Sequence, residues 1–183
     1  MPRVVAGSAG GLYLDVPKKY DIRPTLDRIK GVIFSSLAER IPDTNVLDLY
    51  AGTGGLGIEA LSRGAASAVF VEENAEATQC IKNNLTKCHL EGGKVYHQSV
   101  SRFVNEHISD KYDIIFADPP YDKTNKDTVK VPLLEMVRPM LCAGGIFVLE
   151  HYRTKIAPEE VGYEVIRHRN YGETCLTFWK LST

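Results

Sequence analysis

The sequence lacks the cysteine patterns that mark a disulfide scaffold or a zinc site. Its four cysteines, Cys80, Cys88, Cys142 and Cys175, form no Cys-x-x-Cys pair, and its five histidines have no spacing suited to a metal. No run approaches the roughly 20 apolar residues that a membrane helix requires, and the first residues lack the apolar core of a signal peptide. These absences predict a cytoplasmic protein with no bound metal and no membrane partner.

The chain also lacks a large net charge of either sign, because its 183 residues carry a formal net charge of −1. A non-specific nucleic-acid binder is usually markedly basic, so the composition argues against one. Residues 1–30 nevertheless contain six basic side chains against three acidic ones, an excess that an ordinary solvated face would also show. With 44 % hydrophobic residues, the chain is long enough for one compact domain with a buried core.

From Val46 onward, short apolar runs alternate with helix-like stretches. We expect strands at 46–50, 67–72, 94–98, 112–117 and 145–150, and helices at 55–64, 75–88, 100–108 and 128–141. Glycines at 64, 92–93 and 144–145 are expected to mark boundaries between these elements. The alternation predicts an α/β, Rossmann-like, mostly parallel sheet, in which ligands bind at the carboxyl ends of the strands.

Both ends of the chain depart from this alternation. Residues 162–169 and 174–181 resemble two strands joined by the turn 170–173, which predicts an antiparallel hairpin at the end of a seven-stranded sheet. Near the start, residues 4–6 and 12–14 suggest a small hairpin, followed by a helix from about Thr25 to Leu37 with Thr25 as its cap. We therefore expect an N-terminal hairpin and helix extension over 1–40 and a main domain over 41–183.

The stretch from Asp48 to Gly57 joins a predicted strand to a predicted helix through a turn that has few side chains. Gly52, Gly54 and Gly57 form a G-x-G-x-x-G pattern, and Glu72 follows Gly52 by twenty positions. Glycines let backbone N–H groups approach a ligand, and the start of a helix favours negative charge. Because the dinucleotide-binding fingerprint has this same spacing, the spacing alone does not separate NAD from another nucleotide-like ligand.

Two carboxylates favour S-adenosylmethionine over NAD. Asp48, at the end of the first predicted strand, would repel a diphosphate but can bond the ammonium group of a methionine moiety. Glu72 can accept hydrogen bonds from a ribose diol. Ser99, after the third predicted strand, lies where a loop could contact an adenine ring, although capping the next helix is an equally natural role for it.

The tetrapeptide Asp118-Pro119-Pro120-Tyr121 directly follows the fourth predicted strand. The exocyclic amine of a base is a poor nucleophile, because its lone pair is delocalised into the ring. The Asp118 carboxylate and the Pro119 carbonyl can accept its two N–H groups and turn the lone pair toward a methyl donor, while the prolines restrict the backbone. Tyr121 can stack on the base. A turn-forming Asp-Pro and a rim tyrosine are the structural alternatives.

With these residues identified, the chain resembles the RsmD family of bacterial 16S rRNA guanine-N2 methyltransferases. The similarity runs nearly end to end, and it rests most on Arg23-Pro24-Thr25-Leu26-Asp27-Arg28, since the other motifs are shared by many amino-methyltransferases. Further matching segments are Arg3 to Gly7, Leu47 to Gly57, Glu59 to Ala65, Asp118 to Tyr121 and Tyr171 to Thr174.

The resemblance implies methyl transfer from S-adenosylmethionine to the N2 amine of one guanine in 16S rRNA, within a small-subunit assembly particle. The implied catalytic residues are Asp118, Pro119, Pro120 and Tyr121. The implied cofactor-binding residues are Asp48, Tyr50, Ala51, Gly52, Thr53, Gly54, Glu72, Asn74, Ser99, Val100 and Asp118. The resemblance also implies that Arg23, Thr25 and Arg28 face the RNA or close over the cofactor. We expect RNA binding by these three residues together with Lys18 and Lys19, and a methyltransferase domain over residues 41–183.

The chain departs from the family pattern in its N-terminal hairpin. Relatives usually carry Arg and Lys there, whereas this sequence has Ser8-Ala9-Gly10-Gly11-Leu12-Tyr13, so phosphate contacts are lost from the expected surface. Methylation of an adenine or cytosine amine, or of a protein glutamine, remains an alternative within the reaction class. An NAD-dependent oxidoreductase and a catalytically silent RNA-binding assembly factor are the alternatives from other classes.

Overall fold

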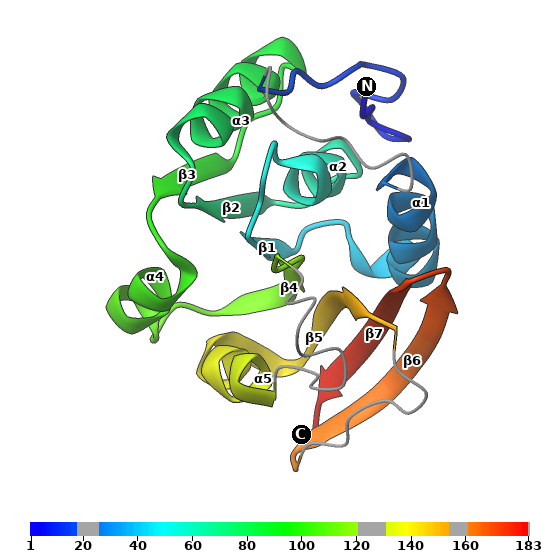
Figure 1. Cartoon of the computed structure of the whole chain (residues 1–183), viewed down its shortest axis with the longest axis vertical. Coiled ribbons are helices and arrows are strands. Elements are labelled where there is room, and N and C mark those ends of the chain that lie inside the picture. Colours follow the sequence, from blue (N-terminus) through cyan, green and yellow to red (C-terminus); the bar gives the residue numbers. More distant parts are fainter. Residues whose placement is uncertain (18–25, 121–130, 154–160, 183) are drawn as a thin grey trace.

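The predicted α/β sheet is confirmed by a computed structural model, which describes residues 1–17, 26–120, 131–153 and 161–182. Its strands are β1 Asn45–Leu49, β2 Ser67–Glu72, β3 Gly93–His97, β4 Tyr112–Ala117, β5 Leu141–Tyr152, β6 Tyr163–Tyr171 and β7 Thr174–Leu181. Within the described residues these seven strands form one sheet in the order β3-β2-β1-β4-β5-β7-β6 (Figure 1). Strands β1 to β5 run parallel, whereas β7 lies antiparallel to both β5 and β6.

Helices cover both faces of this sheet. They are α1 Leu26–Leu37, α2 Gly55–Ser62, α3 Ala75–Lys87, α4 Val100–His107 and α5 Val131–Val137, with short 3-10 turns η1 Ala38–Arg40 and η2 Arg138–Met140. Buried side chains of α1, α2 and α3 share one hydrophobic cluster with the sheet, and those of α4 and α5 share a second cluster on the other face. None of the helices in the described ranges is long and apolar enough to cross a membrane.

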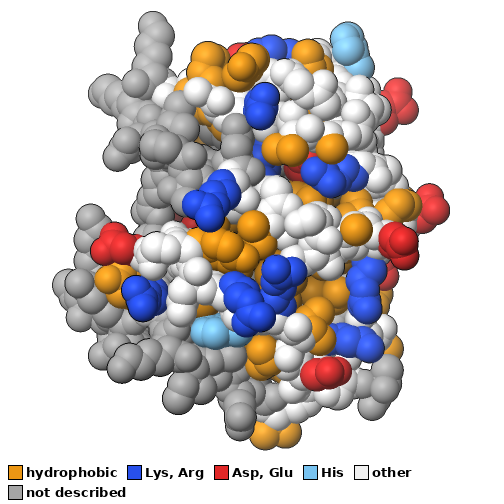
Figure 2. All heavy atoms as spheres, turned by 90° about the vertical axis from the view of Figure 1, so that its right-hand side faces the viewer, with side chains coloured by type: hydrophobic (Ala, Val, Ile, Leu, Met, Phe, Trp, Pro, Cys, Tyr) orange, Lys and Arg blue, Asp and Glu red, His pale blue; other side chains and the backbone are white. Residues whose placement is uncertain are grey.

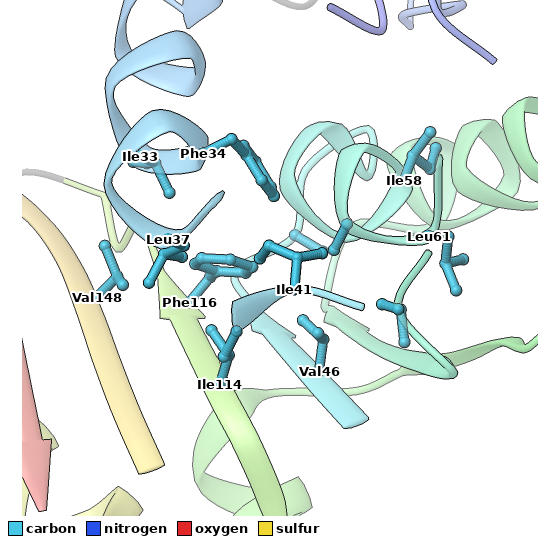
Figure 3. Close-up of a cluster of buried hydrophobic side chains, with 14 of the residues drawn as sticks. Ile33, Phe34, Leu37, Ile41, Val46, Ile58, Leu61, Ile114, Phe116 and Val148 are labelled. Atoms are coloured by element: carbon cyan, nitrogen blue, oxygen red, sulfur yellow. The ribbon is translucent and has the colours of Figure 1, made fainter. Parts of the chain in front are cut away.

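Helix α1 is fastened to the middle of the sheet by large buried side chains. Figure 3 shows Leu37 of α1 beside Phe116 of β4 and Val148 of β5. The ring centroids of Phe34 and Phe116 lie 5.7 Å apart, and both side chains are fully buried. Burying large aromatic side chains is strongly favourable, and this packing places α1 above the carboxyl ends of the central strands.

The strand and helix boundaries agree with the expected ones to within two residues except around α5 and β5. The predicted turn 170–173 is shorter, because β6 extends to Tyr171 and only Gly172 and Glu173 connect it to β7. The predicted strand 145–150 is longer, Leu141–Tyr152, and Gly144 lies within it at a left-handed φ of +72°. The register of β5 against β4 shifts between Tyr112 and Ile114, so the glycine accommodates an irregularity in the strand. The predicted helix 128–141 is wrong at its end, since α5 stops at Val137 and η2, which contains Pro139, follows it. Residues 128–130 lie outside the described ranges.

The N-terminal segment is attached to α2 by buried polar contacts. The predicted hairpin is reduced to one antiparallel bridge between Arg3 and Tyr13. The fully buried Glu59 accepts hydrogen bonds from the N–H groups of Val5 and Ala6, at 2.7 and 3.0 Å. Gly7 has a φ of +85°, and a Cβ there would lie 1.8 Å from the Ser62 carbonyl oxygen, so only glycine fits this close approach.

Candidate functional site

A cavity of about 400 Å³ lies at the carboxyl ends of the parallel strands. The turn after β1, the ends of β2 and β4, and the first residues of α4 all contribute to its wall. The lining residues are Pro2, Ile29, Lys30, Asp48, Tyr50, Ala51, Gly52, Thr53, Gly55, Leu56, Val71, Glu72, Glu73, Gln98, Val100, Asp118, Pro119, Pro120, Glu150 and Thr174. This volume is within the range of small-molecule and cofactor sites.

The glycine-rich turn owes its shape to a series of left-handed residues. Tyr50, Gly52 and Gly54 have φ values of +59°, +55° and +84°. Tyr50 is the unusual member, because a side chain at positive φ is strained, and such strain concentrates at functional sites. Gly54 is the N-cap residue of α2, and a Cβ on Gly57 would lie 2.3 Å from the Phe70 ring. The turn therefore brings bare backbone to the wall of the cavity and lets α2 pack closely on β2.

Asp48 is a buried carboxyl group at the end of β1. It is 2 % exposed, and its Oδ2 accepts a 2.8 Å hydrogen bond from the N–H of Gly57. Burial raises the pKa of Asp48 to about 8; the Gly57 hydrogen bond opposes the rise and the nearby Glu72 charge adds to it. At neutral pH the group is mainly uncharged. A cationic ligand in the cavity would favour its ionised form, which suits the ammonium of a methionine moiety.

Glu72 holds the turn from the neighbouring strand. Its Oε2 accepts a hydrogen bond from the N–H of Gly52 at 2.8 Å, and its Oε1 accepts one from the N–H of Asn74, also at 2.8 Å. A carboxylate oxygen has more than one acceptor site, so each oxygen can still accept a hydrogen bond from a ribose hydroxyl. The Glu72 carboxylate thus holds the glycine-rich turn and also lines the cavity.

Asp118, Pro119 and Pro120 form the wall next to the end of β4. Asp118 is half-buried, Pro119 is buried and Pro120 is exposed, so the tripeptide leads from the sheet to the surface. The predicted stacking residue Tyr121 lies outside the described residues. Asp118 and Gly52 line the same cavity. This matters because one bound methyl donor would have to reach both residues.

Three predicted cofactor residues do not line this cavity. The Oδ1 of Asn74 accepts from the N–H of Ala77 at 3.0 Å and caps α3, while the Oγ of Ser99 accepts from the N–H of Arg102 at 3.4 Å and caps α4. Gly54 is buried in the turn. Glu73 lines the cavity in place of Asn74, and Gln98 lines it in place of Ser99. The remaining predicted cofactor residues also line the cavity: Asp48, Tyr50, Ala51, Gly52, Thr53, Glu72, Val100 and Asp118.

Gln98 has an unusual environment at this site. Its Nε2 is buried and has no hydrogen bond of normal geometry within the described part of the chain, although Arg102 and, to a smaller extent, the nearby Gln98 amide lower the pKa of the Glu106 carboxylate on α4. A buried amide without a partner costs free energy, so such a group commonly meets a ligand or an ordered water. Because Gln98 and Val100 line the cavity together, the Gln98 amide is a further candidate for contact with the purine of a bound nucleoside.

The side of the cavity next to α1 contains residues that the sequence analysis missed. Ile29 and Lys30 come from α1, Glu150 from β5 and Thr174 from β7. The buried Lys30 bonds the carbonyl oxygen of Arg3, and its Nζ lies 3.4 Å from Glu59. A sequence signal existed only for Glu150, a polar residue near the end of an apolar strand.

The described residues fit the chemistry of S-adenosylmethionine. A buried carboxyl at the end of β1, exposed backbone around Gly52, and a carboxylate at the end of β2 are the donors and acceptors that its ammonium, carboxylate and ribose groups require. A diphosphate would instead face the Glu72 carboxylate and would further disfavour the ionised form of Asp48, whereas an ammonium group favours that form. The cavity therefore favours a cationic amino-acid nucleoside over a dinucleotide.

The predicted RNA-binding residues are largely outside the described ranges. Lys18, Lys19, Arg23 and Thr25 lie there, whereas Arg28 is exposed on α1. Among the described residues, one group has the residue types of a metal site: His151, His168 and Cys175 have ligand atoms within 4.8 Å of one another. The hydroxyl of Thr177 lies between the two imidazoles, 2.8 Å from each, so a hydrogen-bond network also accounts for this arrangement.

Comparison with known proteins identifies the family of the chain. The family model of Conserved hypothetical protein 95 matches residues 2–180. The Bacillus subtilis protein YlbH, provisionally named an rRNA methyltransferase, is 37 % identical over 97 % of this chain and 98 % of its own length. Ribosomal RNA small subunit methyltransferase D of Escherichia coli is 35 % identical, and the match covers 65 % of this chain and 60 % of that protein.

A solved structure supports the same relationship. The Escherichia coli protein yhhF, provisionally described as a methyltransferase, superposes with a TM-score of 0.85 at 26 % identity, covering 99 % of this chain and 98 % of that one. The matches of sequence and fold confirm the predicted resemblance to the RsmD family. The chain belongs to the family of Conserved hypothetical protein 95, which includes small-subunit rRNA methyltransferase D.

Proposed function

We propose that this protein transfers the methyl group of S-adenosylmethionine to the exocyclic N2 amine of a guanine in 16S rRNA. The relatives' names support rRNA as the substrate and the small subunit as its source. The residues of the cavity support the donor and the type of acceptor atom. We infer that the substrate is presented within a small-subunit assembly particle, as the family resemblance implies.

One observation carries this proposal: the glycine-rich turn and the Asp118-Pro119-Pro120 wall share a single cavity. Methyl transfer requires the donor carbon and the acceptor nitrogen to meet in line, at a separation near van der Waals contact. A cofactor site and an amine site that opened onto different surfaces would exclude this reaction.

The chemistry then follows from the Asp118 wall. When bound, S-adenosylmethionine supplies an electrophilic methyl group on a sulfonium. Asp118 and the Pro119 carbonyl accept the two N–H groups of the guanine amine and orient its lone pair. That lone pair forms the new N–C bond as the C–S bonding pair returns to sulfur, and the product nitrogen, now acidic, loses a proton toward the Asp118 carboxylate. Pro119 and Pro120 hold these acceptors in place by restricting the backbone.

We further propose that residues 1–40 form an RNA-facing extension of a methyltransferase domain over 41–183. Figure 2 views the face that carries α1 and the β6–β7 hairpin, where Lys and Arg side chains spread over the middle and the visible Asp and Glu side chains lie mostly toward the edges. Exposed basic residues of α1, of the η1 turn after it and of β6 include Arg28, Arg40, Arg167 and Arg169. Such a surface can position a phosphate backbone without reading its sequence.

A labelled-methyl assay tests the function directly. The protein is incubated with labelled S-adenosylmethionine and, separately, naked 16S rRNA, purified small subunits from cells lacking the methyltransferase, and DNA, and the modified nucleoside is identified. We expect N2-methylguanosine in the small-subunit rRNA. Methylated adenine or cytosine, or labelled protein, would replace the proposed acceptor, whereas tight binding of NAD without binding of S-adenosylmethionine would exclude the reaction class.

A further inference from the structure

Glu150 occupies the position beside Asp118 on the neighbouring strand. Strands β4 and β5 are parallel, with Phe116 paired to Val148 and Ala117 paired to Leu149. The residues that follow this last pair are Asp118, directly after the end of β4, and Glu150, within β5. Neighbouring strands lie about 4.8 Å apart. The two carboxylates therefore leave adjacent strands at the same level of the sheet.

Alternation along the strands places both side chains on one face. Phe116 and Val148 belong to the hydrophobic cluster under α1, whereas Ala117 and Leu149 belong to the cluster on the opposite face. Successive side chains point to opposite faces of a sheet, so the residues after Ala117 and Leu149 return to the α1 side. Both carboxylates line the cavity, in agreement with this placement.

Two adjacent carboxylates match the donor pattern of guanine. Guanine has the N1–H donor next to the N2 amine, whereas adenine and cytosine have an acceptor ring nitrogen next to theirs. With Asp118 bonding the amine, a neighbouring acceptor would bond the N1–H of guanine and would face the lone pair of an adenine or cytosine ring nitrogen. Enzymes that take a base out of its helix read it through such contacts to its Watson–Crick edge.

The burial of Glu150 makes this discrimination effective. Glu150 is 8 % exposed, and Thr174, which also lines the cavity, is 9 % exposed. Little water can reach this wall to satisfy a mismatched group, and leaving a buried polar group without its partner is costly. The exclusion of water from this part of the cavity therefore increases the selectivity against the wrong base.

We propose that Glu150 is the residue that selects guanine, by accepting the N1–H of the base whose amine is held by Asp118. This assignment rests on the proposed function, because it deepens the choice of acceptor at the same site. In this assignment, Asp118 bonds the amine that reacts, and Glu150 bonds the ring N1–H that distinguishes guanine from the other bases.

Nucleotide binding in the presence of S-adenosylhomocysteine tests the assignment. Guanosine monophosphate is compared with 2,6-diaminopurine riboside monophosphate, which keeps the N2 amine but has an acceptor at N1. We expect the unaltered protein to bind guanosine monophosphate at least tenfold more tightly. Glu150→Gln supplies an amide that can donate to an N1 acceptor, so the ratio of the two affinities should fall at least tenfold. Glu164→Gln, an exposed change on β6, is the matched control and should leave the ratio unchanged.

The outcomes separate the two proposals. If the unaltered protein prefers adenosine or cytidine monophosphate, the guanine acceptor itself is wrong. If it prefers guanosine monophosphate but Glu150→Gln leaves the ratio unchanged, only the role of Glu150 is overturned. A general loss of packing would weaken both nucleotides together and would not shift the ratio. The unaltered protein provides a test that needs no variant, because equal affinity for guanosine and diaminopurine nucleotides would also overturn the assignment.

Discussion

The Asp48 carboxylate and the Gly57 N–H lie 2.8 Å apart, across the turn that follows β1. The hydrogen bond ties the end of the strand to the first turn of α2, and it buries a titratable group where the ammonium of a methionine moiety would bind. The burial raises the pKa of Asp48 to about 8, well above its ordinary value. Cofactor binding and the protonation of Asp48 are therefore linked.

The affinity for S-adenosylmethionine should depend on pH through Asp48. The bound ammonium favours the ionised carboxylate, so below pH 8 binding must release the proton of Asp48, and the affinity should fall as pH is lowered. We expect at least a tenfold weaker affinity at pH 6 than at pH 8, measured by calorimetry in buffers of different ionisation enthalpy. Above pH 8 the ligand's own amine, with an ordinary pKa near 8, loses its charge and the affinity should fall again.

Two controls isolate this effect. Asp48→Asn should remove the loss of affinity between pH 8 and pH 6, because the amide does not titrate. The ligand 5′-methylthioadenosine lacks the amino-acid moiety and should bind the unaltered protein with little dependence on pH. If the affinities for both ligands depended on pH to the same extent, a group other than Asp48 would be responsible.

Replacing Asp118 should separate methyl transfer from cofactor binding. In Asp118→Ala the amine loses its main acceptor, so kcat should fall by about 100-fold or more, the scale of a lost acid–base or orienting group. The affinity for S-adenosylhomocysteine should stay within about tenfold, since Asp48, Glu72 and the turn remain. Asp110→Ala, an exposed change outside the cavity, is the control and should retain full activity. Unchanged turnover in Asp118→Ala would remove this residue from the mechanism.

The sequence predicted those parts of the site whose signals are local. Asp48 lies near the end of an apolar strand, and the glycine turn and Asp118 each follow such a strand directly. These strand ends meet at one edge of a parallel sheet. The sequence did not predict which of two adjacent residues at a strand end lines the cavity. Asn74 and Ser99 cap helices, and which neighbour enters the cavity depends on the backbone angles at the strand ends.

Residues contributed by distant elements were missed for another reason. Lys30, Glu150 and Thr174 reach the cavity through the position of α1 and through the order β4-β5-β7. Sequence periodicity assigns a strand but does not give its neighbour or its register. The length of β5 was underestimated because Gly144, at a φ of +72°, marks an irregularity within a strand rather than its beginning.

Glu59 should be a major determinant of stability. The carboxylate is fully buried, bonds the N–H groups of Val5 and Ala6, and pairs with Lys30 and Arg63 at 3.4 and 2.8 Å. Glu59→Ala removes a charged partner of the buried Lys30 and the acceptor of two buried N–H groups, and we expect a loss of about 3 to 5 kcal/mol in the free energy of unfolding. Urea unfolding measures it.

A matched substitution tests whether burial is the cause of this effect. Glu39→Ala removes an exposed carboxylate from η1 and should change the free energy of unfolding by less than about 0.5 kcal/mol. Limited proteolysis should also cut the first seventeen residues faster in Glu59→Ala, because their attachment to α2 is weakened, although the hydrogen bonds with Ser62 remain. Equal stability of the two variants would show that the N-terminal segment is held by other contacts.

Two glycines should respond to alanine in opposite directions. A Cβ at Gly57 would lie 2.3 Å from the fully buried Phe70 ring, so Gly57→Ala must displace that ring and should lower the free energy of unfolding by about 1 to 3 kcal/mol. A Cβ at Gly31, within α1, would meet no atom within 4 Å, so Gly31→Ala should raise the free energy by up to about 1 kcal/mol. Thermal and urea unfolding of both variants measure these effects. Because both changes add the same methyl group to a helix, a shared direction would show that helix propensity, rather than the close approach of α2 to β2, decides the outcome.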